Sequence, residues 1–160
     1  MAEFPSLNEI LAYRNPTITE RFSRKYPELK NQADTLLTEL LKFLWLFKKH
    51  SVDQRKFPED KTLQFKFLMH NEMVLMDEMW HEFIIVTKDY THFCQHYFGE
   101  YLHHIPEALQ KPEFNPHKNT EHEIAIFEKE LQLYLSYVYD HLGEKTMRHW
   151  FSVYFTDATM

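Results

Sequence analysis

The sequence predicts an all-α protein, an irregular bundle of four to six helices, and three observations carry this prediction. Apolar residues recur at intervals of three and four over most of the chain, which is the spacing of one helix face. Only two glycines occur in 160 residues, Gly99 and Gly143, whereas tight hairpin turns usually require glycine. The seven prolines fall mostly between the periodic segments, where they interrupt helices.

The first third of the chain is expected to form two short helices and one long helix. The short helices are predicted over residues 6–13, with Ser6 as the N-cap, and over residues 16–26. A strong helix is expected over 31–50, because its apolar residues follow one face without interruption. The polar stretch 51–61 is predicted to be a loop.

The middle of the chain is predicted to form a long helix, a shorter helix and a surface loop. The long helix covers residues 62–86, and a helix over 90–98 follows, with Asp89 as its N-cap. Gly99 then provides a left-handed stop for this second helix. The proline-rich stretch 106–118 is predicted to be a loop.

The C-terminal part is predicted to begin with a capped helix. Thr120 and Glu123 have the spacing of a capping box, and the apolar stripe after them extends to residue 142. A last short helix is expected over 147–154. Residues 156–160 are expected to form a disordered tail.

Length and composition favour a single domain, residues 1–160, that is soluble and works in the cytoplasm. The net charge is −6 and the basic residues are dispersed, so a nucleic-acid partner is not expected. The longest strongly apolar run, residues 43–47, is too short to cross a bilayer. The N-terminus also lacks a basic region followed by an apolar run, so no secretory signal is predicted.

Residues 76–106 concentrate side chains that ligate metals or exchange protons, and the site is predicted there. The candidate metal ligands in this segment are Asp77, His81, Cys94, His103 and His104. Aromatic residues surround them, so a polar site could be built beside an apolar core.

Asp77 and His81 are one helical turn apart, so their side chains can meet. The pair could ligate zinc or non-haem iron, or Asp77 could orient the imidazole for ligation or catalysis. A structural hydrogen bond between them is the alternative. His70 would lie on the same side of the predicted helix, but roughly 10 Å from Asp77 at 1.5 Å per residue, too far to share the ion.

His103 and His104 follow the Gly99 stop and precede Pro106, so they are expected in a turn. Adjacent side chains point in different directions, and one of the two is expected to face His81. Together with Asp77 this would give three ligands, and an open coordination position could activate water.

Two further features of the 90–98 helix are open to a chemical interpretation. His92 and His96 have a chelating spacing, but they lie opposite the apolar stripe and are expected to face water. Cys94 lies on the apolar stripe and is expected to be a small buried residue. A metal thiolate or a nucleophile assisted by a nearby histidine are the alternatives for Cys94.

The aromatic, histidine, cysteine and glycine residues of the segment 75–106 form a combined pattern, with a weaker continuation to residue 151. Its members are Asp77, Trp80, His81, Tyr90, Phe93, Cys94, Phe98, Gly99, Leu102, His103, His104 and Pro106, and then Tyr134, Gly143 and Trp150. With this pattern the chain resembles the glycine-rich-domain-containing-protein-like family, without its glycine-rich region. The resemblance implies a functional cluster of Asp77, His81 and one of His103 and His104. Members of that family often carry Trp-His-x-His, and here Phe83 takes the place of the second histidine.

Three hypotheses for the function follow, and whether the protein is an enzyme is left open. The first is a small helical protein with a polar His/Asp cluster that binds zinc or non-haem iron. The second is a module that binds a protein partner, in which the same cluster is purely structural. The third is a hydrolase or transferase that uses Cys94 with a histidine.

Overall fold

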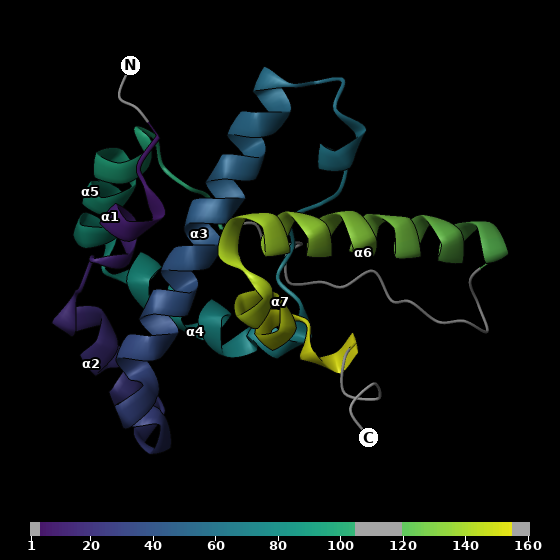
Figure 1. Ribbon diagram of the computed structural model, residues 1–160. Helices are drawn as coiled ribbons and strands as arrows, with labels where there is room; N and C mark the ends of the chain where they lie inside the picture. Colours follow the sequence, from purple (N-terminus) through teal and green to yellow (C-terminus); the bar gives the residue numbers. More distant parts are fainter. Residues whose placement is uncertain (1–3, 105–119, 155–160) are drawn as a thin grey trace. The chain divides into compact units, whose positions relative to one another are not determined.

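The computed structural model describes residues 4–104 and 120–154, and every regular element in these two ranges is helical (Figure 1). Seven α-helices and several short 3-10 helices form there, and no strand does. The all-α prediction is therefore confirmed. The loop predicted over 106–118 and the tail predicted over 156–160 lie outside the described residues.

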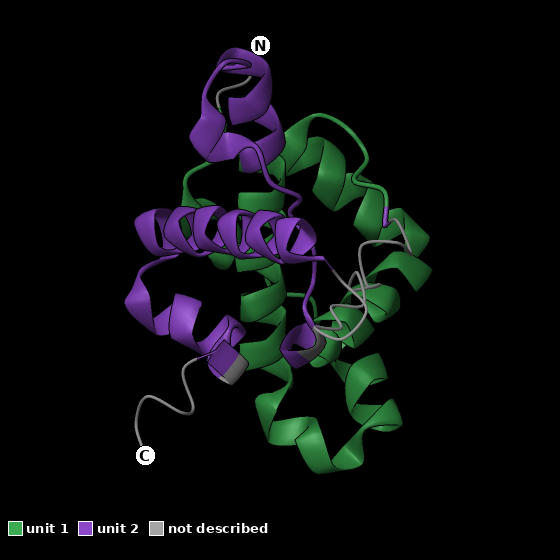
Figure 2. Ribbon diagram, turned by 90° about the vertical axis from the view of Figure 1, so that its right-hand side faces the viewer, with its two compact units in different colours: residues 1–49, 74–103 green, residues 50–73, 104–160 purple. Residues whose placement is uncertain are grey.

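The chain divides into two compact units, which Figure 2 shows in different colours. Unit 1 consists of residues 1–49 and 74–103, and unit 2 consists of residues 50–73 and 104–160. Helix α3 contributes residues to both units, because the division falls within it. The single domain expected from the sequence stays a prediction.

Unit 1 begins with two short helices whose starts are fixed by side-chain caps. Helix α1 (Leu7–Leu11) begins at a capping box, in which Ser6 Oγ accepts from the Glu9 N–H and the Glu9 carboxylate accepts from the Ser6 N–H. Helix α2 (Pro16–Lys25) starts with proline at its first position, after Asn15 as the N-cap. The sequence predicted both helices, and it identified Ser6 as the N-cap of the first.

Helix α3 (Ala33–Lys56) follows the 3-10 helix η1 (Pro27–Gln32) and is longer than the sequence analysis predicted. The prediction of a loop from residue 51 is wrong for 51–56. This stretch is polar but contains no glycine or proline, so nothing in its backbone interrupts the helix. Basic residues in its last turn also suit a helix C-terminus.

The long helix predicted over 62–86 is wrong in its first half. Two 3-10 helices, η2 (Lys61–Leu63) and η3 (Asn71–Met73), flank a non-helical stretch, and α4 (Val74–Ile85) begins only afterwards. Burial alternates along the non-helical stretch, as in an extended chain with one face inward. The buried residues there are Leu63, Phe65, Phe67 and Met69. Their spacing of two was visible in the sequence, where it favours an extended backbone over a helix.

Helix α5 (Thr87–Phe98) begins three residues earlier than expected, after Val86. The prediction of Asp89 as its N-cap is wrong: Asp89 lies in the first turn and its carboxylate accepts a hydrogen bond from Asn15 Nδ2 at 2.9 Å. Gly99 ends the helix with φ of 73°, the left-handed conformation that favours glycine. The predicted stop is therefore confirmed.

The core of unit 1 lies where α4 packs against α2 and α5 (Figure 1). Phe83 is fully buried there, and its ring lies 4.9 Å from the Tyr90 ring and 5.0 Å from the Phe93 ring. The Tyr13 ring stacks on it at 5.7 Å. Aromatic rings in such contacts stabilise the core beyond the burial of their area.

Unit 2 contains the helices α6 (Glu121–Leu142) and α7 (Glu144–Trp150), which pack against each other, and the 3-10 helix η5 (Ser152–Tyr154). The Thr120 side chain caps α6 by accepting from the Glu123 N–H at 3.2 Å. Helix α6 ends at Gly143, as the sequence predicted.

Two tyrosines and one histidine in the core of unit 2 have hydrogen-bond partners for their side chains. The Tyr134 hydroxyl donates to the Leu68 carbonyl at 2.6 Å, and the Tyr137 hydroxyl donates to Asp53 at 2.8 Å. His50 Nε2 lies 2.9 Å from the Leu63 carbonyl oxygen, and burial lowers the pKa of this imidazole.

Candidate metal centre

Helix α4 supplies two members of the candidate site from consecutive turns. The Asp77 carboxylate lies 3.3 Å from His81 Nε2, as the four-residue spacing predicted. Asp77 is 3% exposed, whereas His81 is half-buried at the edge of the helix. The buried side chains of Met76, Met79, Trp80 and Phe83 fix the orientation of α4 within unit 1. The pair therefore lies on a rigid helix at the boundary between core and solvent.

The segment 99–104, which carries the histidine pair, is held against α4 and α5. The Tyr90 hydroxyl donates to the carbonyl of Leu102 at 2.6 Å and accepts from Trp80 Nε1 at 3.0 Å. The side chain of Leu102 is itself buried. The backbone is thus fixed immediately before His103.

Further contacts hold the start of the same segment. Glu100 forms an ion pair with Lys48 of α3, whose side chain is largely buried. The Tyr101 ring lies edge-on to the Tyr90 ring at 5.2 Å. The His103 ring lies 4.8 Å from the Tyr101 ring, and His103 is exposed.

The other histidine of the pair lies with Asp77 and His81. Each of Asp77, His81 and His104 offers a ligand atom, and these atoms lie within 4.8 Å of one another. His104 directly follows the last residue of unit 1 along the chain. Two imidazoles and one carboxylate are a donor set suited to zinc or to non-haem iron.

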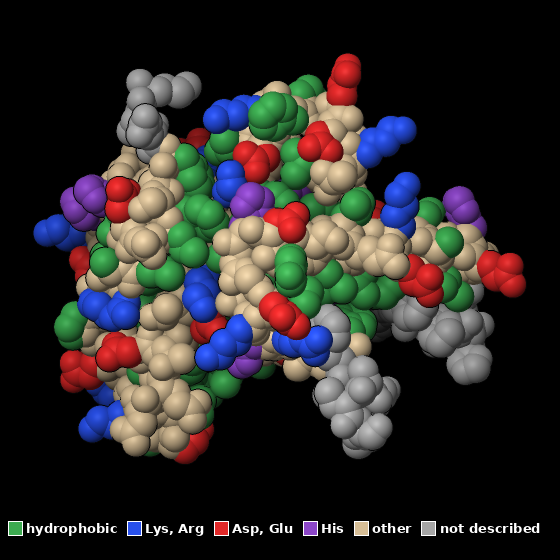
Figure 3. Space-filling view, viewed as in Figure 1, with side chains coloured by type: hydrophobic (Ala, Val, Ile, Leu, Met, Phe, Trp, Pro, Cys, Tyr) green, Lys and Arg blue, Asp and Glu red, His purple; other side chains and the backbone are tan. Residues whose placement is uncertain are grey.

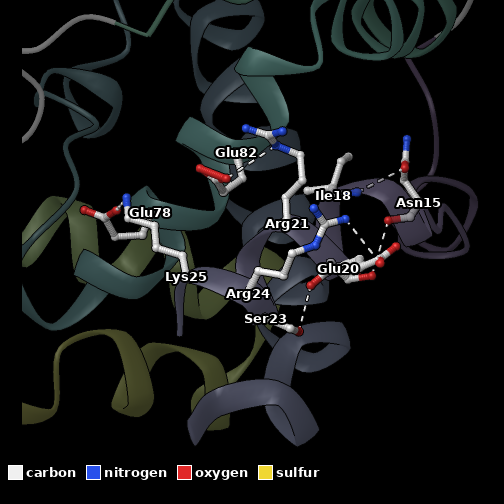
Figure 4. A network of polar contacts seen from close by, with 10 residues as sticks. Asn15, Ile18, Glu20, Arg21, Ser23, Arg24, Lys25, Glu78 and Glu82 are labelled. Carbon is white, nitrogen blue, oxygen red and sulfur yellow. Dashed lines mark hydrogen bonds and ion pairs between the residues drawn. The ribbon is translucent and has the colours of Figure 1, made fainter. Parts of the chain in front are cut away.

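A network of ion pairs joins α4 to α2 beside this site (Figure 4). Lys25 Nζ lies 2.9 Å from the Glu78 carboxylate, and Arg21 Nε lies 3.5 Å from the Glu82 carboxylate. The hydrogen bond from Lys25 lowers the pKa of Glu78. Both carboxylates are therefore neutralised by cations of α2, which disfavours them as further metal ligands.

Cys94 is fully buried on α5, as the sequence predicted. Burial raises the pKa of its thiol, and its hydrogen-bond partners are the Leu102 backbone and the Tyr90 hydroxyl. A buried, protonated thiol is a poor nucleophile and a poor metal ligand. This environment favours the interpretation of Cys94 as a small core residue.

The remaining histidines near the predicted site lie elsewhere. His92 and His96 are both exposed on α5, as predicted, and their rings are nearly parallel with centroids 6.1 Å apart. His70, which the predicted long helix placed on the same side as Asp77 but two turns away, is not part of α4. Its ring lies 5.0 Å from the Phe151 ring in unit 2.

Tyr90 and Trp80 help to place the histidine pair, and the sequence did not predict this role. Both were assigned only to an apolar stripe or a family pattern. A buried Trp N–H and a buried Tyr hydroxyl usually need polar partners, which was the available signal. Those partners come from other elements, so local periodicity could not identify them.

Acidic and basic side chains are interspersed over the face that Figure 3 shows. This distribution fits the expectation that nucleic acid is not a partner, which stays a prediction. Within residues 4–104 and 120–154, no helix is both long and apolar enough to cross a membrane.

Fold and candidate site together define an all-α protein with a cluster of two histidines and one carboxylate. The chain belongs to the UCP032817-like family, whose model matches residues 7–124. The matched range contains Asp77, His81 and His104. Neither the curated proteins nor the solved structures compared with the chain gave a significant match.

Proposed function

We propose that Asp77, His81 and His104 form a mononuclear binding site for a divalent transition metal, zinc or ferrous iron. The observation that carries this proposal is the approach of their three ligand atoms to within 4.8 Å of one another. Three protein ligands that leave a coordination position open are typical of catalytic rather than structural zinc sites.

The distances within the cluster suit a single ion. Two atoms that are each about 2.1 Å from a tetrahedral metal lie roughly 3.4 Å apart. Asp77 and His81 are already 3.3 Å apart. The widest pair, at no more than 4.8 Å, needs to close by at most about 1.4 Å, which small side-chain rotations can provide.

The exposure of the cluster supports a reactive rather than a closed site. Asp77 is buried, but His81 and His104 are only half-buried, so water can reach the open side. A metal held by three protein ligands can bind water there and lower its pKa toward neutrality. Asp77, His81 and His104 would hold such an ion, which would supply Lewis-acid activation of water at this open side.

The resemblance to the glycine-rich-domain-containing-protein-like family supports the same location. Its pattern includes Asp77, His81 and both members of the histidine pair. Phe83 replaces a histidine found in many of those relatives, but its side chain lies in the aromatic core of unit 1. Position 83 is therefore not needed for the three-ligand cluster. A cytoplasmic location stays a prediction.

The test is metal analysis of protein purified without a histidine tag. The exposed pair His92 and His96 could bind added metal weakly, so a variant with both changed to Ala provides the background. We expect about one zinc or iron per chain in the wild type and in this double variant. Adding His81→Ala to the double variant should remove the metal.

Thermal unfolding gives an independent measurement. A metal that binds only the native state raises the melting temperature in proportion to its saturation. If gentle purification yields no metal, and neither zinc nor ferrous iron raises the melting temperature, the cluster is a structural hydrogen-bond network. The module that binds a protein partner would then be the better hypothesis.

A further inference from the structure

We propose that residues 99–104 form a latch, a segment that is closed when it packs against α4 and α5 and open when it moves away. Closure of the latch couples metal binding at His104 to the burial of Cys94. Tyr90 is the positioning residue that holds the latch closed. The coupling rests on the proposed metal site. The latch itself rests on contacts within unit 1.

Tyr90 joins three parts of unit 1 through one hydroxyl group. Tyr90 is fully buried on α5, and its hydroxyl accepts from Trp80 of α4 and donates to Leu102 of the latch. Without this hydroxyl, a buried indole N–H and a buried carbonyl would lose a partner. Such groups are costly to leave unsatisfied, so the hydroxyl favours the closed latch.

Cys94 depends on the same closed arrangement. Its thiol hydrogen-bonds to the Leu102 backbone and to the Tyr90 hydroxyl. When residues 99–104 move away from α5, the thiol therefore loses its hydrogen bond with the Leu102 backbone. Opening of the latch is thus expected to expose the thiol.

His104 follows Leu102 by two residues, so the anchor at Leu102 limits where His104 can lie. A metal that needs Asp77, His81 and His104 together binds only the closed latch. By linkage, such a metal stabilises the closed state and lowers the population of the open state. The rate at which reagents modify Cys94 should fall by the same factor. The reactivity of one cysteine would then depend on metal occupancy.

The experiment measures the rate at which iodoacetamide alkylates the single cysteine of the native full chain, with and without zinc. Zinc at 100 times its dissociation constant should slow alkylation about 100-fold. Without zinc, Tyr90→Phe should speed alkylation about tenfold, since the open population rises. Tyr139→Phe is the matched control, because Tyr139 is exposed and should leave the rate unchanged.

Two further measurements separate the latch from general stability. Alkylation through local opening should depend only weakly on low urea concentrations, whereas a steep dependence equal to that of global unfolding would overturn the latch. In His81→Ala, zinc should no longer slow alkylation. Equal protection by zinc in that variant would also contradict the coupling, because zinc would be acting elsewhere.

The outcomes distinguish this inference from the proposed function. Stoichiometric zinc binding by the wild type with an unchanged alkylation rate would overturn the coupling and leave the metal site intact. Absence of zinc binding would overturn the metal site and the coupling with it. Zinc-dependent protection that is lost in His81→Ala, together with faster alkylation in Tyr90→Phe, supports the proposal.

Discussion

Helices α4 and α5 each carry a pair of potential ligands at the same four-residue spacing, Asp77–His81 and His92–His96. The first pair has a buried carboxylate, lies 3.3 Å apart and has His104 beside it. The second pair is exposed on both sides, with ring centroids 6.1 Å apart. Identical spacing therefore produces two different environments.

Helical spacing therefore determines which side chains can meet, whereas the surrounding residues determine whether the pair is suited to hold a metal ion. Two imidazoles on an exposed helix must give up solvent and side-chain freedom to hold an ion. On α4, packing of Trp80 and Phe83 has already oriented the helix, and a third ligand arrives from outside it. Part of the ordering cost is thus met before the metal binds.

A histidine introduced at position 83 is the strongest test of this difference. Phe83→His should destabilise the protein by about 3 kcal/mol, because it removes a buried aromatic ring and buries a polar one. It should not increase zinc affinity, since the Phe83 ring lies against Tyr90 and Phe93. Urea unfolding and zinc titration measure the two effects. A gain in affinity would show that position 83 can face the site.

Asp77→Asn separates the metal role of the carboxylate from its structural role. Zinc affinity should fall about 100-fold, because the ligand loses its charge. The metal-free melting temperature should change little, since the amide oxygen can still accept a hydrogen bond from His81. Asp89→Asn on α5 is the matched control and should leave zinc affinity unchanged. A large loss of metal-free stability in Asp77→Asn would favour a structural pair.

His50 extends the comparison to a buried histidine in unit 2. Burial lowers the pKa of His50 in the folded state. The pKa of a histidine in the unfolded chain is about 6.5. Just below that pH the unfolded chain therefore binds a proton at His50 that the native protein does not bind. Stability should therefore be complete above that value and fall as the pH drops below it. His50→Gln keeps a donor for Leu63 but cannot titrate, and should reduce this loss between pH 8 and 5. An equal loss of stability in His50→Gln and in the wild type over this range would contradict the assignment to His50.

The smallest effect is expected for the exposed pair itself. Changing His92 and His96 to Ala should alter the free energy of unfolding by no more than about 0.5 kcal/mol, as for most surface substitutions. Thermal melting with the wild type alongside measures it. A loss of several degrees, or a loss of the tightly bound metal, would remove the distinction between the two pairs.

Elements with local signals were predicted well from the sequence. The capping residues Ser6 and Thr120 and the helix stops Gly99 and Gly143 all lie where they were expected. Two of the three residues of the candidate site were predictable in the same way, since Asp77 and His81 are neighbours on any helix. The prediction of a helix over 62–73 is wrong because buried and exposed residues alternate along most of this stretch, which is the pattern of an extended chain.

The sequence by itself determined the all-α class, the helix ends at Ser6, Gly99, Thr120 and Gly143, and the Asp77–His81 pair, because each depends on residues close together in the chain. Only the tertiary structure decided that His104, and not His103, lies with that pair. It also decided that Tyr90 holds Leu102 and that Phe83 belongs to the core. These arrangements depend on residues far apart in the chain. Such residues come together because the fold must pack its apolar side chains closely and give its buried polar groups hydrogen-bond partners at the same time.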